Sequence, residues 1–222
     1  MRVVVNAAMS VDGKLSTHRR EQVAISGPAD FERVDRLRAD SDAVMVGVGT
    51  VLADDPSLTL DDPNLQARRK AADESPHPAR VVADSTLRMP PDASILDDRA
   101  QTYVLTSDAA SDERMKTVET PTTDVIQTGD ERVALEPALE RLETLEIEQL
   151  MVEGGGELIY SLFEEGLVDE LSVFVGPEII GGRTAPTLAD GDGFVEAFPE
   201  LSLDGVETVD EGVLLRWQVH TD

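Results

Sequence analysis

Residues 153–158 read Glu-Gly-Gly-Gly-Glu-Leu and carry the clearest chemical signal in the chain. An apolar run, 150–152, precedes them, and a segment with helical spacing follows. Successive glycines at the start of a helix can direct backbone N–H groups toward an anion such as a pyrophosphate. A plain strand-to-helix turn is the alternative, but three glycines exceed what a turn needs and cost conformational entropy on folding. Glu153, at the end of the apolar run, is a candidate acceptor for N–H groups of a ligand.

Residues 47–56, Gly-Val-Gly-Thr-Val-Leu-Ala-Asp-Asp-Pro, form a second glycine-containing segment after an apolar run. Gly47 and Gly49 allow a ligand to approach the backbone closely, and Thr50 adds a hydroxyl where a helix could begin. The motif is not a full dinucleotide fingerprint, because Leu52 occupies the position of the third glycine. A glycine turn with a capping threonine therefore remains an equal alternative.

The polar segment 10–15 contains a third candidate, Asp12-Gly13-Lys14. Asp-Gly is a turn signature. Lysine is rare in this chain, which gives Lys14 more weight than a lysine would otherwise have. Either it binds a ligand or it is an ordinary solvated loop lysine, and its local context does not separate the two.

The sequence does not predict a metal site. Cysteine is absent, which excludes disulfides and Cys-ligated zinc. The three histidines have no partner at metal-ligand spacing, and the motifs of zinc proteases, serine hydrolases and P-loop NTPases are absent. Asp54 and Asp55 are adjacent and precede a proline, so we expect a capping or turn role for one of them.

The charge balance is strongly acidic, with 45 Asp and Glu residues against 19 Lys and Arg residues and a formal net charge of −26. The acids are spread along the whole chain, which argues against an acidic tail for a partner. At about 1 M salt the Debye length is near 3 Å, so a salt-rich cytoplasm would screen the self-repulsion. We therefore expect a halophilic, cytoplasmic protein. Nucleic acid is not an expected partner, since its binding needs Lys and Arg patches, and no apolar run approaches the roughly 20 residues of a membrane span.

Apolar runs alternate with amphipathic segments, which predicts a single α/β domain, 1–222, with three layers and a largely parallel sheet. Ligands of such sheets bind beyond the carboxyl ends of the strands, where the candidate segments lie. The polar, proline-containing residues 61–79 are expected to form a surface loop. The predicted strands are 2–9, 42–50, 80–85, 102–107, 123–128, 149–154, 168–180 and 212–220, and the predicted helices are 28–40, 136–148 and 156–167.

Five segments, in this order and spacing, resemble one known family. They read AMSVDGKLST, RLRADSDAVMVGVGTVLADDPSLT, ARVVADSTLRMP, MVEGGGELIYSLFEEGLVDEL and GPEIIGGRTAPT. Together they resemble the reductases of riboflavin biosynthesis, whose fold is like that of dihydrofolate reductase. The resemblance implies a three-layer α/β/α domain with a mostly parallel central sheet and an antiparallel C-terminal strand.

The same resemblance implies an activity. The chain would reduce the ribosylamino group of a pyrimidine phosphate to a ribitylamino group. A nicotinamide cofactor, NADPH or else NADH, would supply hydride to C1′ of the sugar, which needs a proton as the hydride arrives. Arg88 is a candidate for the 2′-phosphate of NADPH. The family is typically homodimeric, and the apolar residues 170–180 are expected to contribute to the interface.

The resemblance also assigns roles to single residues. Asp54 is expected to bind the cofactor and to assist at the reacting sugar, which makes it the predicted catalytic residue. Glu153 is expected to accept hydrogen bonds from N–H groups of the pyrimidine. The predicted cofactor-binding residues are Thr50, Asp54, Ala83, Asp84, Ser85, Thr86, Gly154, Gly155, Gly156 and Glu157. The predicted substrate-binding residues are Lys14, Arg38, Leu58 and Glu153.

Two positions depart from the family pattern. Bifunctional bacterial relatives have an arginine for the substrate phosphate a few residues after Asp-Asp-Pro, where this chain has Leu60 and Asp61. Glu157 stands where close relatives often have threonine, and an acid beside a pyrophosphate is expected to point outward. The candidates that remain for the phosphate are Lys14, Arg38, Arg183 and a partner subunit.

Two other functions remain open. A dihydrofolate-reductase-like enzyme acting on a pterin would also use a strand-end acid such as Glu153, although Lys14 and Arg38 favour a phosphorylated substrate. A non-catalytic nucleotide sensor would keep the fold without turnover. Nicotinamide oxidation measured with each substrate separates the three functions.

Overall fold

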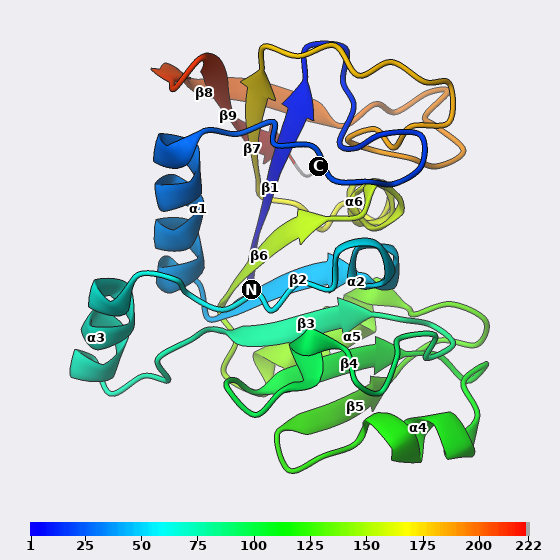
Figure 1. Ribbon diagram of the computed structural model, residues 1–222. Helices are drawn as coiled ribbons and strands as arrows, with labels where there is room; N and C mark the ends of the chain where they lie inside the picture. Colours follow the sequence, from blue (N-terminus) through cyan, green and yellow to red (C-terminus); the bar gives the residue numbers. More distant parts are fainter. Residues whose placement is uncertain (221–222) are drawn as a thin grey trace. The chain divides into compact units, whose positions relative to one another are not determined.

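The computed structural model describes residues 1–220 of the 222-residue chain (Figure 1). Its strands are β1 (Arg2–Ser10), β2 (Ala43–Gly47), β3 (Ala79–Ala83), β4 (Thr102–Thr106), β5 (Thr123–Gln127), β6 (Gln149–Gly154), β7 (Glu170–Gly176), β8 (Glu200–Val209) and β9 (Gly212–His220). Its α-helices are α1 (Pro28–Asp40), α2 (Val48–Asp54), α3 (Pro63–Ala71), α4 (Asp112–Val118), α5 (Leu135–Glu143) and α6 (Gly156–Glu164), and η1 (Ser94–Leu96) is a short 3-10 helix. None of these helices has the length and hydropathy of a membrane span.

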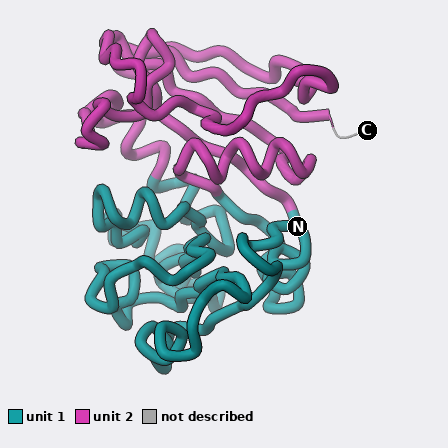
Figure 2. Tube along the Cα trace, turned by 90° about the vertical axis from the view of Figure 1, so that its right-hand side faces the viewer, with its two compact units in different colours: residues 1, 35–151 teal, residues 2–34, 152–222 magenta. Residues whose placement is uncertain are grey.

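The chain divides into two compact units (Figure 2). Unit 1 consists of Met1 and Asp35–Met151, and unit 2 consists of Arg2–Val34 and the described residues from Val152 onward. The boundary after Met151 lies within β6, so each unit contains part of that strand. The single domain expected for 1–222 stays a prediction.

The sheet of unit 1 has the strand order β5-β4-β3-β2-β6, and β2 to β5 pair in parallel. The central strands are continuous apolar runs, in which Val44, Val82 and Val104 are fully buried. Such runs are typical of parallel strands that are covered on both faces. The register places Gly47 beside Ala83, so the carboxyl ends of β2 and β3 lie next to each other.

The sheet of unit 2 has the order β6-β1-β7-β9-β8. β1 pairs with β7 in parallel, whereas β9 is antiparallel to both β7 and β8. Phe174 and Leu214 from neighbouring strands pack in its core with Ile25. The mostly parallel sheet with an antiparallel C-terminal strand is therefore confirmed, and β8 adds a second antiparallel strand that the sequence analysis does not predict.

The expected surface loop over 61–79 is wrong for residues 63–71, which form α3. Asp62 is the N-cap residue and accepts a hydrogen bond from the backbone N–H of Asn64 at 2.8 Å. Pro63 suits the first helical position, because its missing N–H would have no partner there. An Asp-Pro pair therefore starts a helix inside a segment whose composition indicates a loop.

Arg69 explains how such a polar helix is held. Its side chain is buried and donates to the carbonyl oxygens of Ala39 and Ser41 at 2.9 Å each and of Ser75 at 2.9 Å. The helix is anchored by hydrogen bonds to distant backbone rather than by an apolar face. Hydrophobic periodicity cannot reveal an anchor of this kind.

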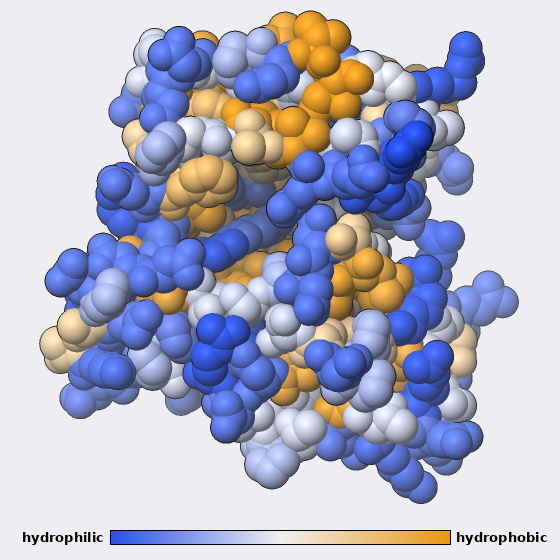
Figure 3. Space-filling model, in the orientation of Figure 1, coloured by the Kyte–Doolittle hydropathy of each residue, from blue (hydrophilic) through white to orange (hydrophobic). Residues whose placement is uncertain are grey.

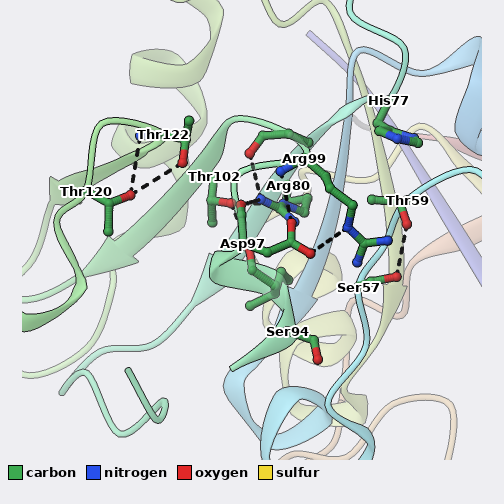
Figure 4. Close-up of polar contacts among 12 residues, drawn as sticks. Ser57, Thr59, His77, Arg80, Ser94, Asp97, Arg99, Thr102, Thr120 and Thr122 are labelled. Carbon is green, nitrogen blue, oxygen red and sulfur yellow. Dashed lines mark hydrogen bonds and ion pairs between the residues drawn. The ribbon is translucent and has the colours of Figure 1, made fainter. Parts of the chain in front are cut away.

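A second buried arginine fixes β3. Arg80 is fully buried, and it donates to the Thr102 hydroxyl at 2.9 Å, to Asp97 Oδ1 at 2.7 Å and to the Ala100 carbonyl at 2.6 Å (Figure 4). Burial lowers the pKa of Arg80, and the hydrogen bond with Asp97 opposes that effect. Arg99 also binds Asp97, but it is half exposed. Arg80 thereby ties the strand that leads to Ala83 to the segment after η1.

Arg80→Lys should lower the free energy of unfolding by about 2 to 4 kcal/mol, because one ammonium cannot reach all the acceptors and leaves some buried without a donor. Arg99→Lys is the matched control on the same carboxylate and should cost at most about 1 kcal/mol, since its ion pair is solvent-exposed. Urea denaturation of both variants measures the two values. Equal losses in the two variants would contradict the structural role of Arg80.

Candidate functional site

In unit 1, the predicted cofactor-binding residues gather where β2 and β3 end. The pairing of Gly47 with Ala83 brings the start of α2 beside the turn 83–86. Thr50 lies in the first turn of α2 and Asp54 is its last residue, and both are half-buried. The structure therefore brings Thr50 and the turn 83–86 to one edge of the sheet, as the sequence analysis predicts.

Gly49 lies in the same turn of α2 and has open space beside its Cα atom. A Cβ atom added there would meet no heavy atom within 4 Å, and its φ is not in the left-handed region. Neither the backbone conformation nor the packing of the described residues requires glycine at this position. Space for close approach of a ligand is a sufficient reason for it, so the residues present fit a bound cofactor.

The turn 83–86 is held rigidly by the end of β4. The carbonyl of Ser85 accepts hydrogen bonds from the Thr106 hydroxyl at 3.1 Å and from the Ser107 hydroxyl at 2.8 Å. Asp84 is fully buried, and its carboxylate accepts the Met89 N–H at 2.8 Å. Asp84 and Ser85 thus build the turn, and Ala83 (half-buried) and Thr86 (exposed) are the members that a ligand can reach.

The two adjacent acids after α2 have different surroundings. Asp55 has a left-handed backbone with φ +43°, and its carboxylate accepts the N–H and the hydroxyl of Ser94 at 2.7 and 2.8 Å. A capping or turn role for one acid of the pair is confirmed, and Asp55 has it. The catalytic role expected for Asp54 stays a prediction.

Arg38 and Leu58 lie close together in unit 1. Arg38, near the end of α1, donates to the carbonyl oxygen of Thr59 at 3.3 Å. Leu58 is buried at 3% exposure and has φ +51°, a strained conformation for a branched side chain. Strain of this kind persists only where the surrounding structure holds it, and two further residues hold the segment that follows Leu58.

Asp35 and His77, for which no role is predicted from the sequence, hold residues 60–62 by hydrogen bonds. Asp35 is buried and accepts the N–H groups of Asp61 at 3.2 Å and Asp62 at 2.9 Å. His77 Nδ1 accepts the N–H of Leu60 at 3.1 Å. Burial, followed by the nearby charge of Arg99, lowers the pKa of His77, which keeps the ring neutral and able to accept.

In unit 2, β6 leads through the three glycines into α6. Gly155 has φ +96° and is the N-cap residue of α6, without a side chain that caps the helix. The first backbone N–H groups of a helix have no acceptor within it, which suits such a helix start to an anion. Glu153 is half-buried between the buried Val152 and Gly154, whereas Glu157 is exposed, as the sequence analysis expects.

Lys14 lies in a turn that several polar groups hold. The Ser10 hydroxyl accepts the Lys14 N–H at 3.0 Å and donates to Asp12 at 2.6 Å. Asp12 also accepts the N–H groups of Ile180 and Gly181 at 3.1 and 2.7 Å. The hydrogen bond from Ser10, followed by the one from Ile180, lowers the pKa of Asp12 to about 2. The turn is thus tied to the segment after β7.

Residues 170–180, expected to contribute to a subunit interface, are mostly interior. Leu171, Val173 and Phe174 are at most 5% exposed, so the expectation is wrong for β7. Ile179 at 72% and Val11 at 60% are exposed, near the ends of β7 and β1. Figure 3 shows apolar surface gathered there.

A hollow of about 500 Å³ lies in unit 1 along β5 and α5. Its lining residues include Gln127, Pro137 and Arg141, and it contains no residue of the predicted site. We assign no ligand to it. Within residues 1–220, no group of three or more His, Cys, Asp or Glu side chains is arranged to hold a metal ion.

Comparison with known sequences shows the family. The profile of the RibD C-terminal domain matches residues 1–215. The chain is 46% identical over 210 residues to the 2,5-diamino-6-ribosylamino-4(3H)-pyrimidinone 5′-phosphate reductase of Archaeoglobus fulgidus, covering 95% of this chain and 94% of that protein. It is 44% identical over 202 residues to the reductase of the same name from Methanothermobacter thermautotrophicus, covering 91% and 89% of the two chains.

Solved structures agree with the sequence comparison. Acinetobacter baumannii RibD in crystal form 1 superposes with a TM-score of 0.77 at 27% identity, covering 99% of this chain and 58% of that one. A pyrimidine reductase-like protein from Corynebacterium diphtheriae reaches a TM-score of 0.83 at 19% identity and covers 100% and 92% of the two chains. At that identity the second likeness shows the fold alone. The predicted dihydrofolate-reductase-like α/β fold is confirmed, and the chain belongs to the RibD C-terminal domain family, the reductases of riboflavin biosynthesis that its motifs resemble.

Proposed function

We propose that the chain reduces 2,5-diamino-6-ribosylamino-4(3H)-pyrimidinone 5′-phosphate to its ribitylamino product, with NADPH as the hydride donor. The observation that carries the proposal is the 46% identity to the Archaeoglobus fulgidus reductase over 95% of the chain. At this identity and coverage, the whole fold and the ordered motifs are shared rather than a single motif. The proposal makes the chain an oxidoreductase of riboflavin biosynthesis.

The cofactor-binding part of the proposal rests on two strand ends. In unit 2, the uncapped start of α6 would bind the pyrophosphate through backbone N–H groups. In unit 1, Thr50 would donate its hydroxyl, and Thr86 would contact the ribose side. Arg88 is exposed shortly after Thr86 and would pair with the 2′-phosphate, which is the basis for preferring NADPH over NADH. The bound nicotinamide supplies the hydride.

The substrate part of the proposal rests on charged groups. Glu153 would accept N–H groups of the pyrimidine, because its half-buried carboxylate can accept but not donate. The Lys14 ammonium and the Arg38 guanidinium would bind the phosphate or the sugar. They would take the place of the arginine that bifunctional relatives have where this chain has Leu60 and Asp61. Asp54 would assist at the sugar carbon that receives the hydride, where a proton is needed.

The proposed reaction is tested by following nicotinamide absorbance in 2 M KCl with three substrate conditions: the ribosylamino-pyrimidine phosphate, dihydrofolate, and no substrate. We expect oxidation of NADPH only with the pyrimidine phosphate, and slower oxidation of NADH. Oxidation with dihydrofolate alone would identify a pterin reductase. Binding of NADPH without any turnover would identify a nucleotide sensor.

Two substitutions should distinguish the residues that bind the cofactor from those that bind the substrate. Gly49→Ala should weaken NADPH binding about tenfold or more, because its methyl group takes space needed by the ligand, and should change stability by no more than about 1 kcal/mol.

Glu153→Gln should raise KM for the pyrimidine phosphate about tenfold or more by removing a charged acceptor, and leave the Kd of NADPH nearly unchanged. NADPH fluorescence titration and steady-state kinetics measure both. If NADPH affinity collapses in Glu153→Gln, this residue is assigned to the wrong ligand.

Part of the surface of unit 2 is suited to a subunit contact. β8 is the last strand of its sheet, and in it Leu201, Leu203 and Val206 are exposed by 40%, 53% and 60%. They pair with Val219, Trp217 and Leu215 of β9, so all six side chains share one face of the β8–β9 hairpin. A register shift between Leu203 and Gly205 keeps Val206 on that face. We call this surface the hairpin face.

We propose that the hairpin face binds a second copy of the chain to form a homodimer. Exposed apolar side chains on one face are suited to pack against the same face of a second copy about a two-fold axis, the commonest symmetry of homo-oligomers. Each copy has a net charge of −26, so association requires salt that screens the repulsion. The proposal thereby combines the expected homodimer with the expected halophilic origin. The cytoplasmic location stays a prediction.

Light scattering should give the mass of a dimer in 2 M KCl and a larger monomer fraction in 0.1 M KCl. Val206→Lys should give monomers in both, because it places a charge on the hairpin face. Val195→Lys, at a position 93% exposed in a loop, is the matched control and should dimerise like the wild type. A dimer that persists in Val206→Lys would place the interface elsewhere.

A further inference from the structure

Residues 185–190, between β7 and β8, hold the Lys14 turn from a second side. Lys14 pairs with Thr187 through an antiparallel backbone bridge, and the Leu15 N–H donates to the Pro186 carbonyl at 2.9 Å. The Lys14 ammonium donates to the Ala185 carbonyl at 3.2 Å. An ammonium has three N–H donors, so this contact orients the group and leaves donors for a ligand.

Asp190 fixes the segment that orients Lys14. Its two carboxylate oxygens accept the Thr187 N–H at 3.2 and 3.1 Å, and Oδ1 accepts the Thr187 hydroxyl at 2.5 Å. Hydrogen bonds to an ionised acceptor are about twice as strong as neutral ones. Thr187 is therefore held on one side by Asp190 and on the other by Lys14.

The same acid reaches the glycines of the α6 start. The Asp190 N–H donates to the Gly156 carbonyl at 2.9 Å. A Cβ atom on Gly156 would lie 2.5 Å from the Thr187 carbonyl oxygen and 2.7 Å from Asp190 Oδ2. This glycine is therefore required by the close packing of the segment 187–190 and not only by an anion.

We propose that Asp190 and Thr187 form a clamp that positions the Lys14 ammonium relative to the α6 start, which makes Asp190 a positioning residue for the reduction. The inference rests on the proposed function, in which Lys14 binds the substrate and Gly154–Gly156 bind the cofactor. A continuous series of contacts within unit 2 links Gly156 to Asp190 and Asp190 to Thr187 by hydrogen bonds, and Thr187 to Lys14 by the backbone bridge. Removing the carboxylate leaves the Thr187 N–H without its acceptor and releases the Ala185 carbonyl that orients the ammonium.

The clamp can be tested without any turnover. The chain has three lysines, and Lys70 and Lys116 are exposed whereas Lys14 is half-buried. Acetylation of the intact protein, followed by peptide mass analysis, gives the reaction rate of each lysine. Asp190→Ala and Thr187→Val should raise the Lys14 rate about threefold or more, as local release of a protected group predicts, and leave Lys70 and Lys116 unchanged.

Two results of the labelling experiment would contradict the clamp. An unchanged Lys14 rate in both variants overturns the clamp. A uniform rise at all three lysines reports global destabilisation and overturns it as well. Thr187→Ser keeps the hydroxyl and should restore the wild-type rate, and a Thr187→Ser protein as reactive as Thr187→Val would remove the hydroxyl from the clamp. If Asp190→Ala does not fold, the Thr187 pair decides alone.

Kinetics connect the clamp to the reaction. Asp190→Ala should raise KM for the pyrimidine phosphate about tenfold, equivalent to about 1.4 kcal/mol, with a smaller effect on kcat. In a Lys14→Ala background the same substitution should have little further effect on KM, since the residue it positions is gone. Fully additive effects overturn the positioning role. A wild-type protein without turnover overturns the proposed function instead, and the labelling result still decides whether the clamp exists.

Discussion

Parallel pairing of β2 with β3 is the constraint on which the candidate site of unit 1 depends. Because Gly47 lies opposite Ala83, the α2 segment and the turn 83–86 must emerge at the same edge of the sheet. Both strands are covered on both faces, so their register is given by the parallel pairing that runs from Ala43 beside Ala79 to Gly47 beside Ala83. The buried Arg80 adds to this by fixing β3 against the chain that follows η1.

Aspartate carboxylates stabilise several loops by accepting hydrogen bonds from backbone N–H groups. Asp35 and Asp55 accept backbone N–H groups of distant segments, and Asp84 and Asp190 accept those of their own loops. A carboxylate can accept several such bonds and cannot donate in its ionised form, which suits it to loops whose N–H groups would otherwise lack partners. The acidity of this chain is therefore not confined to a solvated surface, and part of it is built into the framework.

Some features could be read from the sequence and others could not, for physical reasons. β6 and β9 begin and end as predicted, because apolar runs bounded by glycine or polar residues define them. β8 escaped prediction because its bulge interrupts the alternation of Leu201, Leu203 and Val206. The candidate site residues are predicted by motif, but the turn role of Asp55 depends on Ser94, which is distant in sequence. Local patterns cannot report a partner that only folding brings near.

The register shift in β8 has a consequence for how large an assembly can become. A straight terminal strand with apolar side chains is a template on which further strands can stack without end. Here the shift interrupts the ladder and adds twist, and the exposed Asp204 lies within it. Regular pairing of further copies along this edge is therefore disfavoured. The irregularity that keeps one face apolar thus also makes this edge a poorer template for further strands.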